Sequence, residues 1–207
     1  MSGAEQSRYR VGPGYLDDAE ISPLRRGFDE LFLSGLQRLG AFVAAHWLAL
    51  LNLWMAAFSI FPLLAPVLLA QGLAQPASLL YSAYGHVCHQ APERSFFILG
   101  QKVAYCQRDT AVYLSVLAAG LAYSFVRHRV RSLDWRLYCL LVCPMAVDGL
   151  TQLLGWREST WELRSLTGVL FGVASVWLGY PLFEKSMAQL AEEMSPPPSL
   201  PPEPNSG

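Results

Sequence analysis

The sequence has few charged residues for its length. Charged side chains make up 15% of its 207 residues, and hydrophobic ones make up 53%. A soluble domain usually has about 25% charged residues, which keep its surface in contact with water. The mean hydropathy of +0.28 agrees with this shortage. The composition therefore excludes an ordinary soluble domain and predicts a membrane protein.

Three further absences limit the function. The formal net charge is -1, so the chain has no basic surplus to attract a nucleic acid, and we expect no nucleic-acid partner. Four cysteines are too few for a small secreted domain held together by disulfides. No phosphate-binding loop, nucleophile elbow or zinc-protease motif occurs, so the sequence leaves open whether the protein is an enzyme.

The N-terminal part precedes the first long apolar run. Residues 1–21 contain no apolar core of the kind that a cleaved signal peptide needs, and we expect a flexible cytoplasmic segment. In residues 22–46 apolar side chains recur at helical spacing with arginines on the other sides. This pattern predicts an amphipathic helix at the membrane interface. The alternative is a cytosolic extension of the first span.

Four apolar runs predict an all-α, polytopic bundle of about four membrane spans within residues 47–185. The runs are 47–69, 111–126, 137–155 and 165–183. Segment 77–106 is interrupted by Pro92 and by charged residues, so we expect an interfacial or re-entrant helical hairpin there. In the last run, two pairs of small residues at i, i+4 spacing predict a closely packed face. These pairs are Gly168 with Gly172 and Ser175 with Gly179.

Basic residues set the expected orientation. Four arginines fall in the connection 127–136, and the rule that cytoplasmic loops are positively charged puts this connection and both termini in the cytoplasm of a multi-pass cell-membrane protein. Connections 70–110 and 156–164 then lie on the outer side. Residues 186–207 are rich in proline towards their end, which predicts a disordered cytoplasmic tail.

The outer connection between the first two spans concentrates residues that ligate metals. His86, Cys88, His89 and Cys106 lie within 21 residues, and imidazole and thiolate groups bind transition metals. On a regular helix the two histidines share a face while Cys88 points away, which leaves Cys88 free to approach Cys106. The two cysteines either form a disulfide, remain inert, belong with the histidines to a metal or cofactor site, or provide a reactive thiol. Cys139 and Cys143, on the third span, are expected to be small apolar residues inside the bundle.

A second group of polar residues surrounds a carboxylate inside the third span. Asp148 lies about two turns inside this run, where an unpaired charge is costly, so it needs a partner or a wet cavity. We expect an ion pair with Arg108 or Arg164, in preference to Arg94. Arg157 belongs to a connection whose residues are equally typical of an ordinary solvated loop.

In these segments the sequence resembles a family of predicted bacterial and archaeal membrane proteins, domain of unknown function 2085. The resemblance covers about residues 80–185 and rests on several short motifs in order. They are Cys88-His89-Gln90, Arg94-Ser95-Phe96, Cys106-Gln107-Arg108 with Tyr113, Asp148-Gly149-Leu150-Thr151-Gln152 and Arg164-Ser165-Leu166-Thr167-Gly168. Many members have a cysteine where this chain has Asp109, which weakens a thiolate site here. The resemblance implies a membrane protein with a shared polar site and transfers no activity.

Because the two polar groups are expected on the same side of the membrane, we predict one outer-facing site. Its expected binding residues are His86, His89, Gln90, Arg94, Arg108, Asp109, Asp148, Gln152 and Arg164. The hypothesis is an integral membrane protein that binds a transition metal, a redox cofactor or a lipid-like small molecule. The alternative is a non-catalytic membrane subunit or assembly factor whose polar residues are structural. Expected partners are membrane lipid and either further copies of the chain or other subunits of a membrane complex.

Overall fold

The computed structural model describes residues 23–127 and 129–194. Five α-helices account for most of this part of the chain. They are α1 (Pro23–Ala70), α2 (Ala74–Gly85), α3 (Gln107–Val126), α4 (Trp135–Leu153) and α5 (Trp161–Glu193). Between α2 and α3 lie a short 3₁₀ helix (Pro92–Arg94) and the strands β1 (Ser95–Ile98) and β2 (Gln101–Cys106). Our expectations for residues 1–21 and for the end of the tail, 195–207, lie outside the described residues.

Three helices of the described part are long and apolar enough to cross a membrane. They comprise Gly27–Ala70, Gln107–Val126 and Trp161–Glu193, and they contain the first, second and fourth expected spans. α4 covers most of the expected third span but is not among the three, because Arg136 and Asp148 reduce its apolar character. α5 continues to Glu193, so the first part of the segment expected as a disordered tail is helical.

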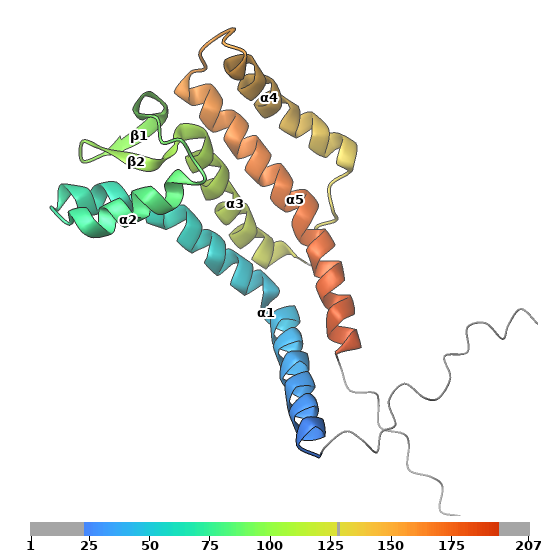
Figure 1. Cartoon of the computed structure of the whole chain (residues 1–207). Helices are drawn as coiled ribbons and strands as arrows, with labels where there is room; N and C mark the ends of the chain where they lie inside the picture. The colour runs from blue at the N-terminus through green and yellow to red at the C-terminus, as the bar shows by residue number, and fades with distance from the viewer. Residues whose placement is uncertain (1–22, 128, 195–207) are drawn as a thin grey trace, which may run out of the picture.

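The first helix is continuous from Pro23 to Ala70. Residues 23–46 are therefore helical and run directly into the first span, without a break between an interfacial helix and a membrane helix. Figure 1 shows that the N-terminal part of α1 (blue) and its C-terminal part (cyan) point in different directions. Apolar side chains in the N-terminal part are exposed, among them Phe28 and Leu31.

The expectation of a helical hairpin between the first two spans is wrong in its second half. α2 is a helix, but it is followed by an antiparallel β-hairpin in which Ile98 pairs with Gln101. Leu99 and Gly100 form the two-residue turn, and both have positive φ angles, 52° and 76°. Such turns match the twist of the flanking strands. Aromatic and β-branched residues on both sides of Leu99-Gly100 favour strands, so the fold is not purely α-helical.

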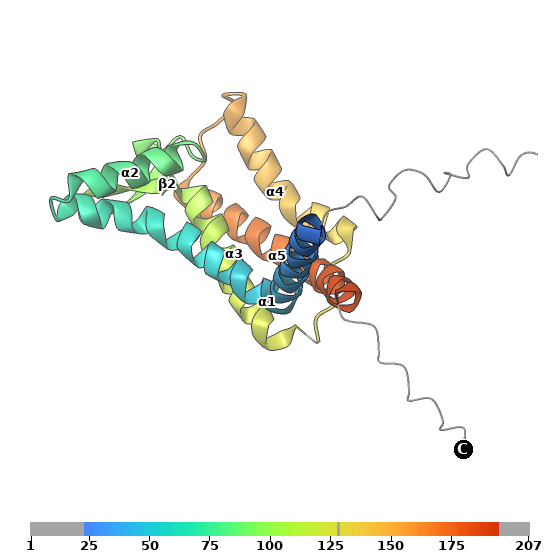
Figure 2. The same ribbon diagram turned by 60° about the horizontal axis from the view of Figure 1, so that its bottom comes forward.

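α3 and α5 lie side by side (Figure 2), and small residues line their contact. A Cβ atom at Gly168 would lie 2.8 Å from the carbonyl oxygen of Arg108, and one at Gly172 would lie 2.0 Å from Ser115 Oγ. The expected close packing at these two glycines is therefore present. Gly179 differs, because a Cβ atom there would meet nothing within 4 Å. Both glycines of the first pair, Gly168 and Gly172, therefore lie at the helix contact, whereas Gly179 of the second pair does not.

A buried asparagine ties α1 to this helix pair. The Asn52 side chain is 7% exposed, and its Nδ2 donates to the carbonyl oxygen of Gly120 in α3 at 3.1 Å. The Tyr180 hydroxyl of α5 donates to Asn52 Oδ1 at 3.5 Å. Trp47, Leu48, Tyr123, Val176 and Tyr180 form the apolar cluster around this point. A second cluster, which includes Ala65, Tyr84, Val103 and Tyr105, fixes α2 and β2 on the end of α1.

Candidate functional site

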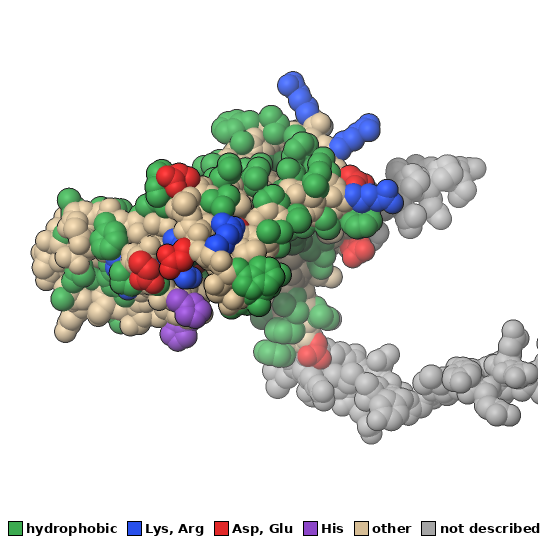
Figure 3. Space-filling view, turned by 90° about the horizontal axis from the view of Figure 1, so that it is seen from above, with side chains coloured by type: hydrophobic (Ala, Val, Ile, Leu, Met, Phe, Trp, Pro, Cys, Tyr) green, Lys and Arg blue, Asp and Glu red, His purple; other side chains and the backbone are tan. Residues whose placement is uncertain are grey.

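Most of the expected site residues lie at one end of the bundle. The N-terminus of α3, the C-terminus of α4, the N-terminus of α5 and the segment between α2 and β1 all reach this end (Figure 1). Figure 3 looks down on it and shows basic, acidic and histidine side chains gathered between the α2 and β-hairpin lobe and the helix bundle. The helices thus bring the two sequence motif groups to one region.

Asp148 is the buried anchor of this region. Its side chain is 1% exposed and forms ion pairs with two guanidinium groups. Arg108 donates to Oδ2, and Arg157 donates to Oδ1 at 2.7 Å. Gln152 Nε2 also donates to Oδ2 at 2.8 Å. The expected pairing with Arg108 is present. Arg157, for which the sequence also allows an ordinary solvated loop, is the second partner and folds the connection after α4 back onto the helix.

Arg164 does not pair with Asp148. Arg164 is 7% exposed, and its Nη1 donates to Gln107 Oε1 at 3.0 Å. Gln107 Nε2 in turn donates to the carbonyl oxygen of Ser95, which links α5 through α3 to β1. The Nε atom of Arg164 is buried and has no hydrogen-bond partner among the described residues. The structure therefore holds a buried guanidinium that faces a neutral amide instead of a carboxylate.

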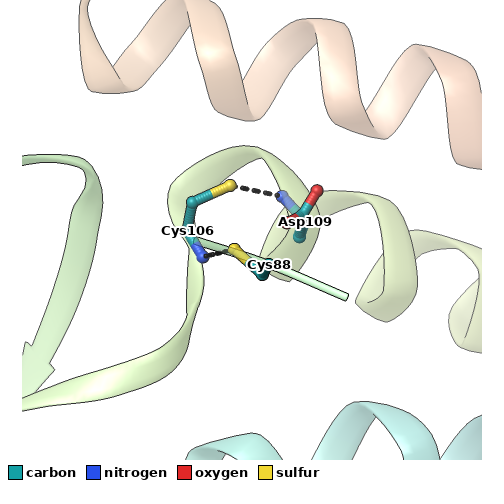
Figure 4. Close-up of side chains that lie close together, drawn as sticks. All are labelled: Cys88, Cys106 and Asp109. Carbon is teal, nitrogen blue, oxygen red and sulfur yellow. Dashed lines mark hydrogen bonds between the residues drawn. The ribbon is translucent and has the colours of Figure 1, made fainter. Parts of the chain in front are cut away.

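The two outer-loop cysteines approach each other next to Asp109. The Sγ atoms of Cys88 and Cys106 and a carboxylate oxygen of Asp109 all lie within 4.8 Å of one another (Figure 4). The N–H of Cys106 donates to Cys88 Sγ at 3.2 Å, and the N–H of Asp109 donates to Cys106 Sγ at 3.4 Å. Both cysteines are free thiols. The expected approach of Cys88 to Cys106 is present, and the disulfide alternative is not realised in this structure.

The two thiols differ in acidity. A hydrogen bond from the Cys106 thiol lowers the pKa of Cys88. Donating that hydrogen bond, together with burial, raises the pKa of Cys106 well above its ordinary value. The Cys106 N–H also donates to Cys88 Sγ, so the backbone helps to stabilise a sulfur anion at Cys88.

Helix α2 ends at Gly85, so the expected helical face of His86, His89 and Gln90 does not form. His86 is exposed, and its Nδ1 contacts the carbonyl oxygen of Ser82 at 2.9 Å. Gln90 is buried with a φ of 52°, and its Nε2 donates to the carbonyl oxygen of Tyr81 at 2.7 Å. The segment folds back through Gln90, which brings Cys88 to Cys106 and leaves His86 outside the cluster.

Two adjoining hollows open at this end. The first, of about 250 Å³, is lined by His89, Gln90, Ala91, Arg94, Cys106, Arg108, Asp109, Gln152 and Arg164. The second, of about 260 Å³, is lined by Glu93, Arg94, Gln107, Glu158, Ser159, Trp161 and Arg164. The first hollow thus brings together seven of the nine expected binding residues. His86 and Asp148 are not among its lining residues.

Two residues at this end were not expected to take part, Gln107 and Arg157. A signal for Gln107 existed in the sequence, since it lies between Cys106 and Arg108.

Cys139 and Cys143 are exposed on α4, so the expectation that they are buried within the bundle is wrong. Their spacing of four residues puts both on one helix face, and in the described structure α4 packs mainly on α5. The face of α4 that bears the two cysteines is therefore turned away from its neighbour.

Comparisons with known proteins agree with the motif resemblance. Residues 88–178 match the family described as predicted membrane protein (DUF2085). An uncharacterized protein of Methanocaldococcus jannaschii is 44% identical over 111 residues, which cover 50% of this chain and 68% of that relative. An uncharacterized protein of Methanothermobacter thermautotrophicus is 36% identical over 90 residues, which cover 44% of this chain and 81% of that relative. No solved structure matches the chain. The family match spans the cysteine cluster, Asp148 and Arg164. By these matches the chain belongs to the DUF2085 family of predicted membrane proteins.

Proposed function

We propose that the protein is an integral membrane protein that binds a divalent transition metal through Cys88, Cys106 and Asp109. The observation that carries this proposal is the convergence of two thiol sulfurs and one carboxylate oxygen within 4.8 Å. In a tetrahedral zinc site, bond lengths of about 2.0–2.3 Å put neighbouring ligand atoms about 3.3–3.8 Å apart. Small side-chain rotations are enough to close the cluster to that size.

The chemistry of the ligand set supports a zinc-like ion. Thiolates favour soft or borderline metals, and a site with three protein ligands leaves the fourth position for water or another molecule. The open side is the first hollow, whose lining also includes His89. Binding of M²⁺ with release of two thiol protons leaves the net charge of the cluster unchanged, so no new buried charge is created.

The expected metal ligands thus change in part. Cys88 and Cys106 stay in the proposal, Asp109 joins them, and His86 leaves it because its ring contacts the backbone of α2. His89 is exposed and lines the same hollow as Cys106 and Asp109, but it is not one of the three residues whose ligand atoms converge within 4.8 Å, so the proposal does not count it as a ligand.

Metal content and a matched set of variants test the proposal. The protein, purified in detergent under a thiol reductant and without chelator, is expected to contain about one Zn²⁺ or to take up one Co²⁺, whose thiolate complexes absorb in the near ultraviolet. Cys88→Ser and Cys106→Ser should each lose this signal. The control Cys143→Ser, which removes an exposed cysteine outside the cluster, should keep it. Asp109→Cys should strengthen binding of a thiophilic ion such as Cd²⁺.

A protein that takes up no metal, or a Cys143→Ser variant that loses as much as Cys106→Ser, would exclude the site. The second candidate, a non-catalytic subunit with structural polar residues, would then be favoured. One observation supports that candidate, because both carboxylate oxygens of Asp148 are occupied by protein groups.

We also propose that α4 is a fourth span and that both termini lie in the cytoplasm. Its 19 residues measure about 28 Å along the axis, close to the thickness of the hydrocarbon core. It runs beside α5 (Figure 1). Arg127, Arg129, Arg131 and Arg136 lie at the opposite end from the hollows. The positive-inside rule then puts the site at the outer face.

Accessibility labelling tests this topology. In a Cys139→Ser, Cys143→Ser background, a membrane-impermeant maleimide applied to intact cells should label Glu158→Cys above the background, while Arg129→Cys should be labelled only after permeabilisation. Labelling of both positions from outside, or of Arg129→Cys alone, would contradict the four-span orientation.

A further inference from the structure

Arg164 is a buried cation for which the described part of the protein supplies no anion. The ion pairs among the described residues join Arg108 and Arg157 to Asp148 and Arg127 to Glu184, and they include neither Arg164 nor Arg94. Arg164 is 7% exposed, yet its hydrogen-bond acceptor is the neutral amide of Gln107. A buried charge is costly unless it is paired and its donors are satisfied.

The orphaned donor belongs to a residue that lines both hollows. Arg164 Nε is buried without a partner among the described residues, and so is Arg108 Nε. A guanidinium has five N–H donors in a planar fork, which matches the oxygens of a carboxylate or a phosphate. Arg164 and Arg94 line both hollows, and Arg108 lines the first.

The charge of the first hollow favours an anion. Three arginines line it against a single carboxylate, Asp109, while Asp148 behind it is shared by two arginines. Glu93 and Glu158 line only the second hollow and are exposed, so water screens their charges. Arg108 and Arg164 lie in the first turns of α3 and α5, where the helix dipoles add positive potential.

We infer that Arg94, Arg108 and Arg164 form a binding site for a phosphate group in the first hollow. Its volume of about 250 Å³ leaves room for a phosphate and a few attached atoms. The group comes either from inorganic phosphate or from an anionic lipid headgroup, which has the same oxygens to offer. The inference goes beyond the proposed metal site and does not require it. Where both sites are filled, the phosphate lies on the open side of the metal, because Cys106 and Asp109 line the same hollow.

Binding measurements on the full chain separate the two phosphate sources. The protein is reconstituted in nanodiscs of phosphatidylcholine alone, and its thermal unfolding is followed by tryptophan fluorescence while inorganic phosphate is added. A second preparation contains phosphatidic acid in the nanodisc and no free phosphate. A rise in Tm with inorganic phosphate identifies a free anion as the ligand, and a rise with phosphatidic acid alone identifies a lipid headgroup. Absence of a rise in both preparations overturns the inference.

Variants keep the test specific. Arg94→Gln removes an exposed guanidinium that makes no hydrogen bond or ion pair with the described residues, so it is expected to fold and to weaken phosphate binding by about 10-fold or more. Arg164→Gln should weaken binding at least as much. Arg129→Gln, which removes an exposed arginine at the other end of the bundle, should leave the binding curve unchanged. Equal loss in Arg94→Gln and Arg129→Gln, or no loss in Arg94→Gln, would show that the Tm shift is nonspecific and refute the site.

Two variants test the metal proposal and the phosphate proposal independently of each other. Cys106→Ser is expected to lose metal but to keep the phosphate-dependent rise in Tm. Arg94→Gln is expected to keep metal and to lose that rise. Loss of phosphate binding in Cys106→Ser would show that the anion needs the metal and would contradict the independent site.

Discussion

Replacement of Asp148 by alanine is expected to destabilise the protein more than any other single change at this end of the bundle. The side chain is 1% exposed and joins α3, α4 and the connection to α5 through two arginines and Gln152. Its removal leaves two guanidiniums without their anion. Breaking a buried ion pair costs about 3–5 kcal/mol. The arginine side chains are 20% and 40% exposed, so water compensates part of the loss.

We therefore expect the free energy of unfolding to fall by about 2–4 kcal/mol in Asp148→Ala, or the Tm to fall by about 5–15 °C. Asp148→Asn keeps an acceptor for one arginine and should lose about half as much. The measurement is thermal unfolding in detergent, with Glu162→Ala as the control for loss of a nearby exposed carboxylate. Arg157→Ala should cost little in the Asp148→Ala background, since its partner is already gone. A Tm within about 2 °C of wild type in Asp148→Ala would refute the role of this carboxylate.

Two further predictions concern the packing and the hairpin. Gly172→Ala should lower the free energy of unfolding by about 1–3 kcal/mol, because its Cβ atom would overlap Ser115 Oγ. Gly179→Ala, where a Cβ atom meets nothing within 4 Å, should be neutral or should raise the free energy of unfolding by up to about 1 kcal/mol. Equal effects of the two substitutions in thermal unfolding would contradict the close α3–α5 contact. Leu99→Asn should raise the free energy of unfolding and Gly100→Ala should lower it, each by about 0.5–1 kcal/mol. Both positions have positive φ, which asparagine adopts more readily than leucine and glycine more readily than alanine. A destabilised Leu99→Asn and a stabilised Gly100→Ala in thermal unfolding would contradict the turn geometry.

The membrane helices could be predicted well because their signal is long and simple. Uncharged runs of about 20 residues are rare in soluble domains, and three of the four expected spans fall within candidate spans. The β-hairpin could not be predicted, because a short apolar run such as Ser95–Ile98 has no periodicity that separates a strand from a helix. The turn at Leu99 also lacks the asparagine or aspartate that usually marks this geometry.

The sequence predicts which residues make up the candidate site better than it predicts the contacts between them. Burial required a partner for Asp148, and Arg108 was among the expected ones. Arg157 was not, because a residue nine positions later lies past the end of the helix, and its position depends on how the chain turns at Gly155, where φ is 71°. The approach of Cys88 to Cys106 was expected, but the end of α2 at Gly85, which removes the shared helical face of His86 and His89, could not be predicted from the sequence.

The length of α1 constrains how the protein sits in a bilayer. Its 48 residues measure about 72 Å along the helix axis, against about 45 Å for a bilayer with its headgroups. A straight helix confined to that thickness would need a tilt of about 50°, beyond the range of about 0–40° that membrane helices adopt. At ordinary tilts, about 16–18 residues project beyond the headgroups. Phe28, Leu31 and Phe32 lie in the N-terminal part of α1 with more than half of their surface exposed, so an overhang at this end presents an apolar stripe that the bilayer core does not cover.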